Sequence, residues 1–271
     1  MSILNFIFRK KSPPIPGVTE TTFSCIRDGL TIRGTEYRPE GNDLPIAIVS
    51  HGFMATQGTV KEYARLLARK GYVSYCFDFN GGCLIKGQSD GKTTDMSVLT
   101  EVKDLEAVIA YARSRPYTGS QLLLMGASQG GMVSALVAAK PDSKVNRLIL
   151  FYPAFCIPDD ARAGKMMMAK FDPNNIPERI NCGPMKLGRC YVADVLHMDP
   201  FQEIQGYTGP VLIVHGTNDK IVHIDYAKKA YAAYSAVCLE QAPLLKIIEG
   251  GSHGFSKEHD STAMAYIEEF A

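Results

Sequence analysis

Short apolar runs alternate with amphipathic stretches along most of the chain. Near-continuously apolar runs predict buried strands at 45–52, 72–79, 121–126, 144–153, 209–216 and 243–250. Between these runs, apolar positions three and four residues apart predict helices at 60–71, 98–115, 225–236 and 259–270, with a further helix starting at Gln129. Buried strands joined by helices are typical of a mostly parallel sheet with helices on both faces, so we predict an α/β fold.

Two regions depart from this alternation. Near the start, the β-rich segments 21–27 and 30–39 flank Asp28-Gly29, a dipeptide that favours a tight hairpin. Residues 155–207 are rich in Pro, Asn, Gly and Met and show no regular strand–helix pattern. We therefore predict one domain, 1–271, in which roughly 155–207 form a cap inserted between two core strands.

Composition and charge exclude several classes of protein. With 271 residues and 46% hydrophobic positions, the chain is long enough for one well-buried core. A net charge of +1 gives no electrostatic reason to expect nucleic acid as a partner.

The seven cysteines are scattered without a C-x-x-C pair, which favours reduced thiols and a cytoplasmic location. The apolar run at 3–8 is too short to span a bilayer, so no stable membrane insertion is expected. The oligomeric state stays open, a homodimer included.

The sequence MGASQGG, residues 125–131, places Ser128 where a buried strand changes into a helix. G-x-S-x-G in that context predicts a nucleophile elbow, in which a strained turn lifts the serine hydroxyl above the sheet. Glycines are needed there because larger neighbours would collide with the adjacent backbone. The helix that begins at Gln129 also points free N–H groups at this position. Ser128 is therefore the predicted nucleophile.

A nucleophilic serine needs a base, which in turn needs a carboxylate to orient it. His253 lies in a glycine-flanked loop after the last predicted strand, and sites in parallel sheets form at the carboxyl ends of strands. Asp219 follows the strand 209–216 and satisfies the chain order serine, acid, histidine. Asp225 is the alternative acid, although it is better placed to begin a helix. His215 ends an apolar strand and is interpreted as a structural histidine.

An acyl-transfer site also needs N–H donors for the oxyanion. Gln129, which follows the nucleophile, supplies one backbone N–H. The loop after strand 45–52 contains His51-Gly52-Phe53, from which we assign the Phe53 N–H as the second donor. The His51 ring is expected to brace this loop.

The motifs HGF, GASQGG, GTNDKIV and GSHGF occur in an order that resembles the α/β-hydrolase superfamily over about residues 20–271. More narrowly, FDFNGG, SDGKTTDMSVLTEVKDL and FDPNNIPERI resemble a bacterial subgroup that contains feruloyl and cinnamoyl esterases. The resemblance implies an α/β-hydrolase fold and a serine carboxylesterase whose cap follows the sixth core strand. One departure is the longer loop DFNGGCLIKGQSDG, which puts the pocket wall near 83–87 in doubt.

In that subgroup the cap supplies polar groups to the phenolic end of hydroxycinnamates. By motif position, this implies that Asp160 and Tyr191 bind substrate here, although a solvent-facing aspartate and a packed tyrosine explain them equally well. The run Met166-Met167-Met168 predicts an apolar, adaptable wall, in which Met167 is taken as a substrate contact. Such a wall favours simple short-chain or aryl esters.

The sequence therefore predicts hydrolysis of a small-molecule ester through an acyl-serine, with no metal and no organic cofactor. Hydroxycinnamoyl esters are among the candidate substrates. Thioesterase, lipase and amidase activities use the same catalytic groups and stay open. A non-catalytic ligand receptor on this fold is a further alternative, which the complete set of serine, acid, base and oxyanion loop disfavours.

Overall fold

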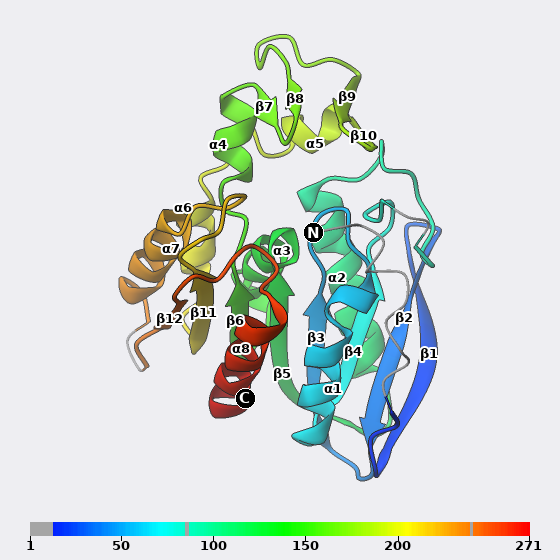
Figure 1. Cartoon of the computed structure of the whole chain (residues 1–271). Coiled ribbons are helices and arrows are strands. Elements are labelled where there is room, and N and C mark those ends of the chain that lie inside the picture. Colours follow the sequence, from blue (N-terminus) through cyan, green and yellow to red (C-terminus); the bar gives the residue numbers. More distant parts are fainter. Residues whose placement is uncertain (1–12, 85–86, 239–240) are drawn as a thin grey trace.

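The computed structural model describes residues 13–84, 87–238 and 241–271. Eight strands form one sheet in the order β1-β2-β4-β3-β5-β6-β11-β12 (Figure 1). Their bounds are β1 Val18–Arg27, β2 Leu30–Pro39, β3 Leu44–Ser50, β4 Val73–Asp78, β5 Thr118–Ala127, β6 Arg147–Phe151, β11 Val211–Gly216 and β12 Leu244–Ile248. β2 runs antiparallel to β1 and β4, and all pairings from β4 to β12 are parallel. The predicted α/β fold with a mostly parallel sheet is confirmed.

The predicted hairpin joins β1 to β2 through Asp28 and Gly29. Both residues adopt positive φ angles, 49° and 79°. Two successive positive φ values match the right-handed twist of the flanking strands, and aspartate followed by glycine tolerates them well. This antiparallel pair therefore extends one edge of the parallel sheet.

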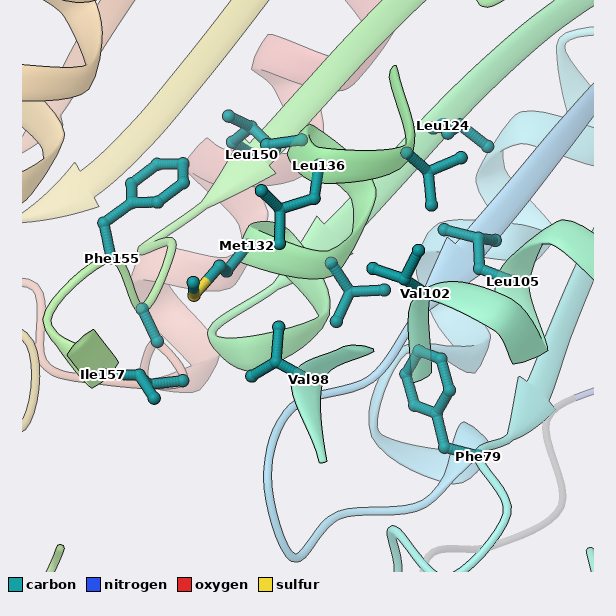
Figure 2. Packing of buried hydrophobic residues seen from close by; sticks show 14 of the residues in the cluster. Phe79, Val98, Val102, Leu105, Leu124, Met132, Leu136, Leu150, Phe155 and Ile157 are labelled. Carbon is teal, nitrogen blue, oxygen red and sulfur yellow. The ribbon is translucent and has the colours of Figure 1, made fainter. Parts of the chain in front are cut away.

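Helices cover both faces of the sheet. The long ones are α1 Lys61–Arg69, α2 Val98–Arg113, α3 Gln129–Ala138, α7 Asp225–Ser235 and α8 Lys257–Phe270, and short 3₁₀ turns occupy Gln57–Thr59 and Pro141–Ser143. One buried cluster contains side chains of α2, α3 and α7, and a second contains side chains of α1 and α8. Figure 2 shows side chains of α2, α3 and β6 meeting in the first cluster, with Phe155 and Ile157 beside Met132. Burial of both faces explains why the core strands are almost entirely apolar.

The interval between β6 and β11 adds no strand to the large sheet. It contains α4 Ile157–Arg162, β7 Lys165–Met166, β8 Ala169–Lys170, β9 Arg179–Cys182, β10 Met185–Gly188, α5 Arg189–Ala193, α6 Pro200–Glu203 and a 3₁₀ turn at Ile204–Gly206. The four short strands form two separate hairpins, which lie beyond the end of the sheet (Figure 1). We call residues 155–207 the cap segment, and the division of 1–271 into one domain with this cap stays a proposal.

The apolar run at 3–8 lies outside the described residues, and so does part of the lengthened loop, 85–86. Within 13–84, 87–238 and 241–271, none of the helices combines the length and the apolar content needed to cross a bilayer. All seven cysteines are described, and each is a free thiol.

Candidate active site

The turn between β5 and α3 holds Ser128 in a strained conformation, with φ 56° and ψ −120°. The close approach of neighbouring backbone explains the flanking glycines. A side chain at Gly126 would collide with the carbonyl of Gly130, and one at Gly130 would collide with the carbonyl of His51. The Ser128 N–H donates to the carbonyl of Phe151 on the adjacent strand at 2.9 Å. The predicted elbow geometry is therefore present, and the Ser128 side chain faces the carboxyl edge of the sheet.

Ser128, His253 and Asp219 form a hydrogen-bonded chain. His253, in the loop between β12 and α8, lies with Nε2 3.0 Å from Ser128 Oγ. Its Nδ1 lies 2.8 Å from Asp219 Oδ2, in the loop after β11. An ionised carboxylate only accepts, so His253 Nδ1–H donates to Asp219 and leaves Nε2 free to accept the serine proton. The structure thus brings together the three predicted residues, which are spread over 126 positions of the sequence.

The Asp219 carboxylate is buried and saturated with donors. Its Oδ1 accepts the backbone N–H groups of Ile221 and Val222, each at 2.9 Å. Its Oδ2 lies 3.3 Å from Nε2 of His215, in addition to its bond with His253. Burial alone raises the pKa of Asp219, but the hydrogen bonds from His215 and His253 outweigh burial and hold the pKa well below its usual range. The carboxylate therefore stays charged, as orienting His253 requires.

His215 has a second role that the sequence interpretation missed. It is fully buried in β11, and the ring donates from Nε2 to the carbonyl of Val222 at 2.9 Å. The same Nε2 faces Asp219 Oδ2, the oxygen that also accepts from His253, so this histidine is a second ring in contact with the carboxylate. The only sequence signal for this contact was that His215 lies four residues before Asp219. The alternative acid, Asp225, is exposed and pairs with Lys228 at 3.1 Å, away from this chain.

The loop after β3 brings its backbone to the nucleophile. A Cβ at Gly52 would lie 2.9 Å from the Ser128 Cβ, so this position approaches the serine as closely as glycine permits. Gln129 is the first residue of α3, where N–H groups have no partner within the helix. Phe53 and Gln129 line the same cavity as Ser128 and His253. These placements support their assignment as oxyanion donors, which stays a prediction.

The buried His51 side chain forms hydrogen bonds that brace the loop after β3. Its Nδ1 donates to the carbonyl of Gly52 at 2.8 Å, and its Nε2 accepts the N–H of Phe79 at 3.2 Å. Burial lowers the pKa of this histidine, which favours the neutral ring that these bonds need.

One trio within the described residues, His51, Asp78 and Cys83, has ligand atoms close enough to share a metal ion. The available atoms already have other partners, because His51 Nε2 accepts a backbone N–H and both Asp78 oxygens accept backbone N–H groups of Gln57 and Gln88. We therefore assign these side chains to bracing the loops. Cys83 and Gly87 of the lengthened loop line a cavity other than the two beside Ser128.

Two cavities open beside Ser128. The larger, about 350 Å³, lies under the cap segment, and the smaller, about 220 Å³, is lined by Tyr63 and Tyr152 on the other side. The three predicted substrate contacts, Asp160, Met167 and Tyr191, all line the larger cavity. Burial raises the pKa of the half-buried Asp160, with Lys165 opposing it. The larger cavity thus combines an apolar methionine wall with one carboxyl group.

Tyr191 and Gln129 are joined through their side chains. The Tyr191 hydroxyl donates to Oε1 of Gln129, and Nε2 of Gln129 donates to Oε2 of Glu101 at 2.7 Å. Glu101 is 2% exposed, and burial raises its pKa to about 8. The sequence interpretation did not single out Glu101. Its position three residues after Val98 and four before Leu105, on the apolar face of α2, was the available signal.

Replacing Glu101 with glutamine is expected to stabilise the fold at pH 8 and above. An unfolded glutamate has a pKa near 4.3, whereas burial raises the pKa of folded Glu101 to about 8. Between these two values the parent protein loses unfolding free energy as the pH rises, because the glutamate is ionised in the unfolded state and still protonated in the folded state. Below about pH 4.3 the carboxyl group is protonated in both the folded and the unfolded state, so its ionisation does not change the free energy of unfolding. The gain in unfolding free energy of Glu101→Gln over the parent should therefore grow from pH 4.5 to pH 8. Urea unfolding across this range measures it, and a gain that shrinks with rising pH would contradict the assignment.

Comparisons with known proteins agree with this geometry. Residues 44–184 match the protein family described as "Serine aminopeptidase, S33". The chain is 25% identical to the monoglyceride lipase of Homo sapiens over 261 residues, covering 85% of this chain and 82% of that protein. It is 27% identical to the carboxymethylenebutenolidase of Pseudomonas putida over 136 residues, covering 46% and 57%.

Among solved structures, Est1E from Butyrivibrio proteoclasticus with ferulic acid bound superposes with a TM-score of 0.81. The identity is 27%, and the match covers 92% of this chain and 98% of that one. The DcsB complex with its substrate analogue matches with a TM-score of 0.71 at 20% identity, covering 93% and 98%, and shows a shared fold. The resemblance to esterases of the α/β-hydrolase superfamily, including the feruloyl subgroup, is confirmed.

Proposed function

Because the chain belongs to the serine aminopeptidase S33 family of α/β-hydrolases, we propose that it is a serine carboxylesterase that hydrolyses small acyl or aryl esters. The observation that carries this proposal is the hydrogen-bonded chain Ser128–His253–Asp219 at the mouth of a cavity lined by Phe53 and Gln129. This arrangement supports the action of the proposed nucleophile, base and oxyanion donors on one carbonyl group, with Asp219 orienting the base behind them.

In the proposed mechanism Ser128 Oγ attacks the ester carbonyl while His253 Nε2 takes the serine proton. The carbonyl oxygen becomes an oxyanion that accepts the N–H groups of Phe53 and Gln129. His253 then protonates the leaving alcohol, and an acyl-serine remains. Water attacks this ester with His253 again as base, and the acid product leaves. Side chains and backbone supply every role, so the proposal includes no metal or organic cofactor.

The size of the larger cavity supports a substrate with a small acyl group. A volume of about 350 Å³ is at the lower end for ligand sites, and the methionine run makes one wall apolar. Ferulic acid bound to Est1E is consistent with an aryl acid here. We propose Asp160 as the polar partner of a phenolic hydroxyl and Met167 as an apolar contact, with the Tyr191 ring completing the wall.

The comparisons also support two alternative substrate classes that differ in the leaving group. The similarity to monoglyceride lipases favours glycerol esters as a second candidate, and the family description favours amides. Both use the same proposed triad. The free state of all seven cysteines supports our proposal of a cytoplasmic location.

Labelling with a fluorophosphonate tests the proposal at the level of the nucleophile. We expect one covalent adduct per chain on Ser128, because the His253–Asp219 pair activates this hydroxyl. Mass spectrometry of the intact protein and its peptides measures the adduct, and heat-unfolded protein is the control. A folded protein that stays unlabelled would instead indicate a non-catalytic ligand receptor.

Substrate class is tested with a panel of p-nitrophenyl esters of increasing acyl length, together with methyl ferulate and methyl p-coumarate. We expect kcat/KM to be highest for C2–C4 acyl or hydroxycinnamoyl groups and to fall steeply for long chains, because the cavity is small. Dipeptide p-nitroanilides provide the amide comparison. Faster turnover of long-chain esters or of anilides would contradict the proposed substrate class.

A further inference from the structure

Tyr191 of the cap segment contacts both residues to which we assign the oxyanion N–H groups. Its hydroxyl donates to the side chain of Gln129, and its ring centroid lies 5.5 Å from that of Phe53. Tyr191 is 1% exposed and belongs to α5. A single cap residue therefore packs against both the loop after β3 and the first residue of α3, to which we assign the two oxyanion N–H groups.

The Gln129 side chain is held at both ends. It is fully buried, with Tyr191 bonded to its carbonyl oxygen and Glu101 accepting from its amide nitrogen at 2.7 Å. Loss of Tyr191 would leave the buried amide oxygen without its donor, and loss of Glu101 would leave the amide nitrogen with only the weak acceptor Met96 Sδ at 3.9 Å, so either loss favours rearrangement of the side chain. The backbone N–H that we assign as an oxyanion donor belongs to this same residue, the first of α3.

Further contacts seat α5 on the start of α2, the helix that carries Glu101. Ser97, the N-cap of α2, bonds through Oγ to the carboxylate of Asp194 at the end of α5. Gly188, just before α5, lies so close to the carbonyl of Thr94 that no side chain would fit there. Tyr191 of α5, in the cap segment, thus meets Gln129 of α3 and Glu101 of α2, two helices that lie against the sheet (Figure 1).

We propose that Tyr191 and Glu101 are positioning residues that act through Gln129, so that seating of the cap segment aligns the oxyanion-binding N–H groups. This inference rests on the proposed function. Its consequence is that the cap determines the rate of the chemical step as well as the shape of the pocket. Oxyanion donors act mainly in the transition state, so a defect in this link should lower kcat and leave KM nearly unchanged.

The test uses Tyr191→Phe, which removes the hydroxyl and keeps the ring. With p-nitrophenyl acetate, whose acetyl group is too small to fill the cavity, we expect kcat to fall about tenfold and KM to change less than about twofold. This loss is below the roughly 10²- to 10³-fold cost of deleting an oxyanion donor outright. Glu101→Leu should give a similar fall, and Glu101→Gln, which can still accept from Gln129, should retain near-parental kcat.

Tyr226→Phe is the matched control. The Tyr226 hydroxyl, on α7, donates to Asp159 in α4 at 2.8 Å, so this variant also removes one bond between the core and the cap segment without touching Gln129. We expect its kcat to stay at the parental value. In the double variant Tyr191→Phe/Glu101→Leu, the losses should be less than multiplicative, because both act on one side chain.

Three outcomes would overturn the inference. The first is an unchanged kcat in Tyr191→Phe. The second is a change in Tyr191→Phe confined to the KM for hydroxycinnamates, which would make Tyr191 a substrate contact only, and the third is a loss of kcat in Tyr226→Phe equal to that in Tyr191→Phe. Melting temperatures and active-site titration with fluorophosphonate show whether each variant is folded and intact. Failure of the esterase proposal itself would appear differently, as absence of labelling at Ser128 in the parent protein.

Discussion

Replacing Ser128 with alanine is expected to lower kcat for p-nitrophenyl acetate by about 10⁴- to 10⁶-fold. The variant lacks the atom that forms the acyl intermediate, and His253 then has no nucleophile within hydrogen-bond distance. Residual turnover should come from binding and from the oxyanion donors alone. The pre-steady-state burst of p-nitrophenol, which reports acylation of the serine, should disappear.

Alanine keeps the Cβ of serine, so the strain of the positive φ at position 128 is unchanged and the fold should survive. Ser134→Ala is the matched control, because Ser134 lies six residues later, is fully buried in α3, and its hydroxyl has no hydrogen-bond partner among the described residues. We expect this control to retain parental kcat. Undiminished turnover by Ser128→Ala, with the burst intact, would rule out Ser128 as the nucleophile.

Asp219→Asn is expected to lower kcat by about 10⁴-fold at neutral pH. The backbone N–H groups of Ile221 and Val222 require an acceptor at the Oδ1 position, so the asparagine must place its carbonyl oxygen there. Its NH₂ group then faces His253. The histidine must turn Nδ1 into an acceptor and carry its proton on Nε2, from which it cannot accept the Ser128 proton.

Asp225→Asn is the control for this loss. Asp225 is exposed and bonds to Lys228, so the same chemical change there should leave kcat within about twofold of the parent. Steady-state kinetics with p-nitrophenyl acetate measures both variants. Nearly parental kcat in Asp219→Asn would show that this carboxylate does not orient the base.

The elements of the fold could be predicted from the chain because their signals are local. Strand β3 is observed at Leu44–Ser50, close to the predicted 45–52, and α2 begins at Val98 as predicted. The elbow at Ser128 was equally accessible, since it depends on a strand, two glycines and a helix within a few residues. The cap segment was recognisable only by its lack of a regular pattern, and its two small hairpins were not predicted.

Partners of buried polar groups were harder to predict. His215 was interpreted as structural and was found to support Asp219, and Glu101 was not singled out although it bonds to Gln129. In both residues a polar side chain lies on an apolar face, which signals that a partner exists without identifying it. Tyr191 was proposed from its motif position as a substrate contact, whereas its hydroxyl is bonded to Gln129.

By itself the sequence determined the α/β alternation, the strained serine turn and the identity of the candidate base and acid, because periodicity and turn chemistry act over a few residues. Only the tertiary structure decided that Ser128 and His253, 125 positions apart, lie 3.0 Å from each other. The sheet order β5-β6-β11-β12 places the loops after β5, β11 and β12 along one edge, and no local pattern encodes that order. The same packing decided that a tyrosine of the cap segment touches Phe53 and Gln129, because such contacts depend on how distant segments fill shared space.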